Sequence, residues 1–148
     1  MSNPPNHSSN IAEWHISIHF CEDNRQLPSK SIEWRGAPYT VLNIDAAQMS
    51  LPFPMAFDEF IGGVNNLNGG YAEGDGSYGI VGPQGNWKVC GNIFEFADSI
   101  QYAEMIGFCP EERFNEFLLQ LGATTSECAI QILQGGFFQS PSQFFESR

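Results

Sequence analysis

Basic residues are scarce in this chain. Its 148 residues include 6 Lys and Arg against 17 Asp and Glu, which gives a formal net charge of −11 at pH 7. A nucleic-acid backbone is held mainly by dense Lys and Arg side chains, and an anionic membrane surface attracts the same residues. The charge balance therefore predicts that neither nucleic acid nor a membrane is a direct partner.

Long apolar runs and targeting features are lacking too. No stretch approaches the roughly 18 consecutive apolar residues that indicate a membrane-spanning helix. The N-terminal residues 1–10 are polar, include two prolines, and have neither the basic nor the apolar region of a secretory signal. We therefore predict a disordered leader at residues 1–10 and a cytoplasmic protein.

Cysteines in metal-binding or redox spacing are also absent. The four cysteines are far apart in the sequence and form no CxxC pair: Cys21, Cys90, Cys109 and Cys128. This pattern favours free, buried thiols over disulfide bridges, and we predict no cofactor and no structural metal. A chain of about 150 residues can bury roughly 70% of its unfolded surface. We therefore expect one domain, residues 11–148, that folds without a disulfide bridge or a structural metal.

Period-two alternation predicts strands in the first two-thirds of the chain. Trp14, Ile16 and Ile18 fall on one face of such a segment, as in a strand buried on one side. The turn residues 83–86 separate two short apolar runs and indicate a hairpin. Strands are predicted at residues 14–20, 32–34, 39–45, 78–81 and 87–90.

Helical spacing of apolar residues predominates in the last third. Phe114, Phe117 and Leu118 form a stripe after Pro110, a residue suited to the first helical turn. Helices are predicted at residues 54–64, 98–106, 110–121, 124–133 and 140–146. The fold class is therefore α+β, a small, mostly antiparallel sheet from the N-terminal two-thirds packed against C-terminal helices.

Glycine is concentrated in the middle of the chain, with 9 glycines among residues 62–86. The segment 74–81 satisfies G-x-G-x-x-G-x-V and resembles the glycine-rich loop of protein kinases. That resemblance implies backbone amides laid over ATP phosphates. The V-A-I-K, H-R-D and D-F-G motifs of that family are missing from this sequence, so a flexible hairpin is the preferred interpretation.

Two further features leave an enzyme or a metal-binding protein open as an alternative. His19 and Cys21 share one face of the first predicted strand and could both reach a Zn²⁺ ion, although two more ligands would have to come from elsewhere. Cys128 follows a predicted helix start, where a thiol pKa can be lowered. The glycine-rich hairpin or the His19/Cys21 strand would carry such an activity.

Acidic residues crowd the segment from Glu95 to Glu127, which contains seven acids and Arg113 as its only base. Glu112 and Glu116 are four residues apart on a predicted helix, where like charges cost a few tenths of a kcal/mol. A basic partner would offset that cost. We therefore predict a non-enzymatic module that sequesters a basic protein of toxin or nuclease type. Immunity and inhibitor proteins work in this way, and the gene could belong to a phage or mobile element.

The residues predicted to bind this partner are acids that steer it and aromatic rings that anchor it. They are Glu104, Glu111, Glu112, Glu116, Phe137, Phe138, Phe144 and Phe145. No catalytic, cofactor-binding or metal-binding residue is predicted. A structural protein that forms a homodimer through its Phe-rich C-terminus is a further alternative.

Overall fold

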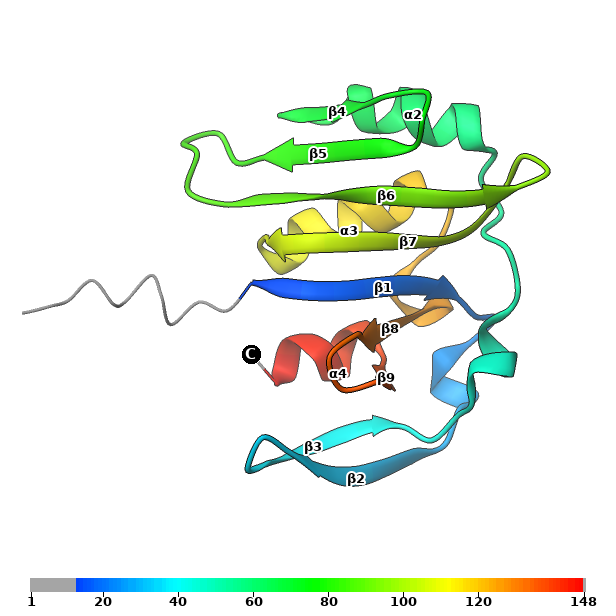
Figure 1. Ribbon diagram of the computed structural model, residues 1–148, viewed down its shortest axis with the longest axis vertical. Helices are drawn as coiled ribbons and strands as arrows, with labels where there is room; N and C mark the ends of the chain where they lie inside the picture. The colour runs from blue at the N-terminus through cyan, green and yellow to red at the C-terminus, as the bar shows by residue number, and fades with distance from the viewer. Residues whose placement is uncertain (1–12, 148) are drawn as a thin grey trace, which may run out of the picture.

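The computed structural model describes residues 13–147, which form nine strands and three α-helices (Figure 1). The leader predicted at residues 1–10 lies outside the described residues. The strands are β1 (Trp14–Phe20), β2 (Ser29–Trp34), β3 (Ala37–Leu42), β4 (Gly70–Ala72), β5 (Ser77–Val81), β6 (Lys88–Phe96), β7 (Ser99–Phe108), β8 (Cys128–Ile132) and β9 (Phe137–Gln139). The α-helices are α2 (Phe57–Asn65), α3 (Glu111–Gln120) and α4 (Pro141–Glu146), and the short 3-10 helices are η1 (Asn24–Gln26), η2 (Ala46–Met49) and η3 (Thr125–Glu127).

All nine strands belong to one antiparallel sheet in the order β2-β3-β9-β8-β1-β7-β6-β5-β4. Strand β1 is central because its alternating Ile16 and Ile18 are buried and its backbone is paired on both sides. The three helices pack on one face of this sheet, where Phe60, Phe117 and Phe144 join a single apolar core. Within residues 13–147, no helix is long and apolar enough to cross a membrane.

The other face of the sheet carries no α-helix of the described chain (Figure 1). Part of it is covered by Met49 from η2, which packs with Ala129 and Phe138 in a second, smaller apolar cluster. Elsewhere it is open, and exposed rings such as Tyr71 and Phe94 lie on it. We call this surface the helix-free face.

The prediction for residues 98–106 is wrong, because this segment is strand β7. Ala97 and Asp98 both have positive φ angles and form the two-residue turn between β6 and β7, so a hairpin turn lies where the predicted helix would begin. The register shifts between Phe94 and its neighbour, which brings both Ile100 and Ala103 to the buried face. The bulge therefore produces a spacing of three that imitates a helix.

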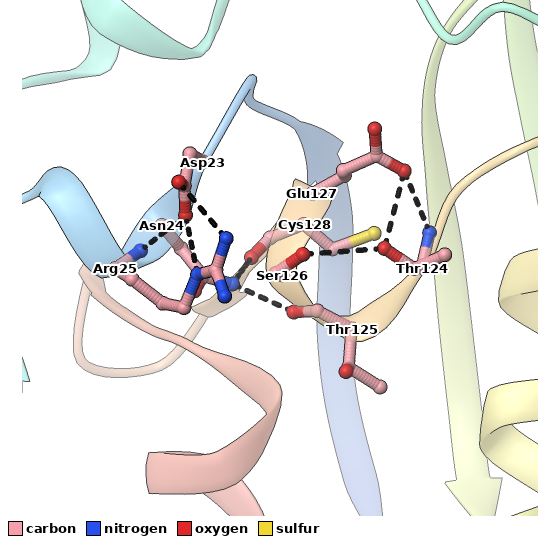
Figure 2. A network of polar contacts seen from close by, with 8 residues as sticks. All are labelled: Asp23, Asn24, Arg25, Thr124, Thr125, Ser126, Glu127 and Cys128. Carbon is pink, nitrogen blue, oxygen red and sulfur yellow. Dashed lines mark hydrogen bonds and ion pairs between the residues drawn. The ribbon is translucent and has the colours of Figure 1, made fainter.

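The helix predicted at residues 124–133 is also wrong. The capping box at Thr124 forms, but it opens only the single turn η3, and strand β8 follows. Figure 2 shows the reason: the buried Asn24 side chain donates to the carbonyls of Thr125 and Cys128, at 2.7 and 2.8 Å. These carbonyls are the acceptors that a continuing helix would need, so the loop after β1 ends the helix.

Several predicted elements are confirmed. The central strand, the hairpin of β5 and β6, and the helices α3 and α4 lie where the sequence places them, within a few residues. Helix α2 begins later than predicted and includes Gly62 and Gly63. The missing side chain of Gly63 leaves room for Gln120 of α3. The α+β class holds, but the sheet is neither small nor confined to the N-terminal two-thirds, since β8 and β9 come from the last third.

Candidate functional site

The sheet opens at one edge, where the hairpin of β2 and β3 meets the rest of the molecule. The two hairpin strands pair with each other over six residue pairs, yet β3 pairs with β9 only at Leu42 and Phe138. Beyond that pair, the hairpin runs toward its turn without a ladder to β9, at the lower edge of Figure 1. Side chains therefore fill the space that backbone pairing would otherwise close.

A pocket of about 600 Å³ lies at this opening. It is bounded by the hairpin turn, the start of β1, the start of α3, and α4. A volume of this size lies within the range typical of ligand sites. Six aromatic side chains line it: Trp14, Trp34, Tyr39, Phe108, Phe144 and Phe145. We call it the aromatic pocket.

Edge-to-face contacts hold the rings of the pocket in place on both sides. On the sheet side, Trp14 packs against Phe144 and Phe145, with centroid distances of 5.0 and 5.5 Å. On the hairpin side, Trp34 packs against Tyr39 at 5.6 Å and against Phe137 at 5.1 Å. Such contacts are favourable beyond the burial of area, and they pre-form the two walls.

Three charged side chains also line the aromatic pocket. The Arg35 guanidinium lies 4.3 Å from the centre of the Trp34 ring, within the range of a cation–π contact. Glu13 and Glu111 are exposed at the rim. Among residues 13–147, neither carboxylate has an ion-pair partner, and neither has Arg35. The pocket thus combines an aromatic wall with an excess of negative charge.

Cys109 and His15 also line the aromatic pocket. Cys109 is buried there, and burial raises the pKa of its thiol to about 12, so it stays protonated at neutral pH. The imidazole of His15 is turned to Glu104, 3.2 Å away. These groups form no nucleophile–base pair of the kind that covalent catalysis requires.

A serine–histidine contact lies on the helix-free face, away from the aromatic pocket. Ser17 Oγ is 2.7 Å from His19 Nε2, and burial lowers the pKa of His19 to about 4. The backbone of β1 is paired on both sides at Ser17, with Glu104 and Gln131. Its amides are committed to the sheet, so none is free to stabilise an oxyanion. This pair was not predicted from the sequence, although both residues point to one face of the strand.

The acidic residues predicted to bind a partner do not form one patch. Glu111, Glu112 and Glu116 lie on α3, whereas Glu104 lies on the helix-free face. Glu116 makes an ion pair with Arg113 at 2.9 Å, so the expected repulsion along this helix is partly relieved. Only Glu111 of the four lines the aromatic pocket.

The four C-terminal phenylalanines are divided between the core and the aromatic pocket. Phe138 belongs to the small cluster on the other face, and Phe144 is fully buried while it lines the pocket. Phe137 and Phe145 are half-buried, the first against Trp34 and the second in the pocket wall. The structure therefore brings Phe144, Phe145 and Glu111 together, and it adds residues that the sequence analysis did not select.

The remaining sequence candidates have structural explanations. In the segment that resembles a kinase loop, the Asp75 carboxylate accepts hydrogen bonds from the amide and hydroxyl of Ser77 and shapes a turn. Gly79 makes room for the Tyr71 ring. All four cysteines are free, and burial raises the pKa of Cys21 to about 11 and raises that of Cys128 instead of lowering it. Within residues 13–147, no group of three or more His, Cys, Asp or Glu could hold a metal ion.

Comparison with known proteins adds no family to this geometry. No family model, curated protein or solved structure gives a significant match to the chain. The pocket and the charge of the molecule are the features that point to a function.

Proposed function

We propose that this protein is a non-enzymatic binding module that holds a basic polypeptide partner at its aromatic pocket. The observation that carries the proposal is the pocket itself, in which six aromatic side chains stand beside the carboxylates of Glu13 and Glu111. Neither carboxylate has an ion-pair partner in the part of the chain that the structure describes. Aromatic side chains in partly desolvated pockets supply most of the binding energy in many protein interfaces. The carboxylates add selection for positive charge.

The net charge of −11 supports the same partner class. A strongly acidic protein attracts basic partners over a distance and repels acidic ones, which raises the association rate at low salt. Proteins that act on nucleic acid carry basic surfaces for that purpose. A basic toxin or nuclease, neutralised by this protein as an inhibitor or immunity protein, is the partner that we propose.

Self-association through the C-terminal phenylalanines has less support. Phe138 and Phe144 are buried within the monomer, and Phe137 and Phe145 are partly covered. Two copies would also bring two strongly negative molecules together. A basic partner faces neither obstacle.

A binding experiment with pocket variants tests the proposal. Peptides rich in Lys and Arg, and matched peptides rich in Glu, are titrated into the full chain by calorimetry at low and high salt. We expect the basic peptides to bind, more weakly at high salt, and the double variant Glu13→Gln/Glu111→Gln to weaken binding several-fold. Asp58→Asn/Glu59→Gln, on the exposed first turn of α2, removes the same charge elsewhere and is the matched control.

A second pair of variants tests the aromatic wall. Trp34→Ala removes one wall of the pocket, whereas Leu119→Ala removes an exposed apolar side chain of α3 outside the pocket. We expect only the first to reduce the affinity for basic peptides, with both variants folded by circular dichroism. If wild type, Glu13→Gln/Glu111→Gln and Trp34→Ala bind basic peptides equally well, the proposed site is contradicted.

A further inference from the structure

Arg35 is placed as a ligand of the aromatic pocket would be. Its guanidinium lies 4.3 Å from the centre of the Trp34 ring, and both residues line the pocket. A guanidinium is planar and weakly hydrated, so it stacks on an aromatic face more readily than an ammonium group does. The chain itself therefore shows that this wall accepts an arginine side chain.

The turn geometry does not explain why an arginine stands at position 35. Arg35 and Gly36 are the two central residues of the hairpin turn, with φ angles of 53° and 78°. Asn, Asp and Gly are the residues that favour this left-handed conformation, and a longer side chain is strained there. The stacking on Trp34 is the contact that position 35 makes and that Asn or Gly could not make.

The carboxylates of the aromatic pocket are left unused by Arg35. Glu13 and Glu111 line the pocket, yet Arg35 forms no ion pair with either of them within the described chain. A guanidinium that entered from outside could stack on the aromatic wall and also meet these carboxylates, which accept its in-plane N–H donors. An incoming arginine would thus gain contacts that Arg35 does not make.

We infer that the aromatic pocket binds an arginine side chain of the partner, and that Arg35 competes with it for the Trp34 ring. This inference rests on the proposed function and names the side chain that the pocket takes. Removal of Arg35 should therefore strengthen binding, although a pocket that recognised an anionic ligand through Arg35 would lose binding.

The test uses the blocked peptide Ac-Gly-Arg-Gly-amide as the probe, with the full chain followed by NMR. The chain has three tryptophans. Trp14 and Trp34 line the pocket, and Trp87 does not. We expect the probe to shift the indole N–H signals of Trp14 and Trp34 and to leave that of Trp87 in place. The same peptide with citrulline, which keeps the shape of arginine without its charge, should bind at least several-fold more weakly, and the lysine peptide should fall between them.

Two arginine variants complete the design. Arg35→Asn suits the turn and clears the Trp34 ring, and we expect it to raise the affinity for the arginine peptide several-fold. Arg25→Asn is the matched control, because Arg25 is an exposed arginine of η1 that pairs with Asp23 away from the pocket. It removes the same charge and should change the affinity little.

The outcomes separate this inference from the proposed function. Equal or weaker arginine binding by Arg35→Asn would overturn the inference, as would equal binding of the citrulline peptide. Lys- and Arg-rich peptides could bind at the pocket while the single-arginine peptide shifts the indole N–H signals of neither Trp14 nor Trp34, in wild type and in Arg35→Asn alike. In that case the inference fails and the proposed function stands. If no basic peptide moves Trp14 or Trp34, both fail.

Discussion

The centre of the sheet and its β2–β3 edge are built on the same antiparallel pattern but are held together differently. Strand β1 pairs with β7 at six positions and with β8 at five, and α3 and α4 seal its buried face. The β2–β3 hairpin is joined to β9 by one pair, Leu42 with Phe138. Where the ladder continues, the sheet is closed and packed, and where it stops, aromatic side chains enclose a pocket.

A buried side chain replaces part of the missing ladder. Gln139 of β9 donates from Nε2 to the carbonyl of Thr40 at 2.9 Å and contacts Ser147 Oγ at 3.2 Å. Its Oε1 atom is buried and has no hydrogen-bond partner among residues 13–147. Besides the Leu42–Phe138 pair, side-chain amides thus tether the hairpin edge, Gln139 to Thr40 and Gln143 Nε2 to Ser29 Oγ at 3.2 Å. The centre is instead tethered by many backbone bonds. Four predictions test how far this contrast extends.

The largest expected effect is the loss of a central ring. Phe117→Ala removes a fully buried side chain that packs against Phe60 and Tyr78, and we expect it to lower the free energy of unfolding by about 3–5 kcal/mol. Tyr39→Ala, in the half-buried hairpin wall, should cost about 1 kcal/mol. Urea denaturation measures both, and equal losses would contradict the contrast between the two regions.

The pH dependence of stability tests whether His19, on the central strand, is shielded from water. Burial lowers the pKa of His19 to about 4, whereas the unfolded chain has a value near 6.5. Between pH 4 and 6.5, His19 is protonated in the unfolded state but stays neutral in the folded state. The contribution of His19 to stability is therefore complete above pH 6.5 and is lost as the pH drops toward 4. The full loss is about 3 kcal/mol.

The variant His19→Gln isolates this contribution, because it cannot titrate and can still hydrogen-bond to Ser17. We expect the difference in stability between wild type and variant to shrink or reverse in favour of the variant as the pH falls from 7 to 4. Urea denaturation at several pH values measures it. A pH profile that is parallel for the two proteins would show that His19 is not shielded from solvent.

The hydrogen bond from Gln139 to Thr40 should stabilise the hairpin more than the rest of the sheet. Gln139→Leu keeps an apolar volume in place but removes the donor to Thr40, and we expect a loss of about 1 kcal/mol. Because this bond joins the hairpin to β9, amide hydrogen exchange in β2 and β3 should accelerate more than exchange in β1 and β7. Uniform acceleration across the sheet would instead mean that the hairpin unfolds together with the centre.

The smallest effect concerns the turn between β6 and β7. Ala97 has a φ of 53°, a left-handed conformation that favours glycine, so Ala97→Gly should stabilise the protein by up to about 1 kcal/mol. Ala37→Gly is the control, since Ala37 lies in strand β3. This substitution should destabilise the protein by roughly 0.5–1 kcal/mol. Thermal unfolding of both variants checks the opposite signs.

Local patterns predicted the elements whose own residues determine them. The central strand follows from the alternation around Ile16 and Ile18, and α4 from Ser140 as a cap followed by Pro141. Strands β7 and β8 were missed because distant partners decided them. A bulge opposite β6 shifts the buried positions of β7, and Asn24 takes the carbonyls that a helix at Thr124 would have used.

The candidate site was predicted only in part for the same reason. Phe144, Phe145 and Glu111 were selected from the sequence, but Trp34, Arg35 and the start of β1 were not. No spacing in the chain connects the β2–β3 turn with the C-terminal helix, since over one hundred residues separate them. Their meeting depends on β9, which lies between β3 and β8 in the sheet.

By itself, the sequence determined the strong negative charge, the free thiols, the half-buried central strand and the helices α3 and α4, because each depends on residue type or on neighbours a few positions away. Only the tertiary structure decided that four segments not predicted as strands, β4, β7, β8 and β9, would join one sheet, and that the sheet would part at β9. Strand pairing and cavities depend on which distant segments become neighbours. That information is carried by packing and long-range hydrogen bonds, and local periodicity does not contain it.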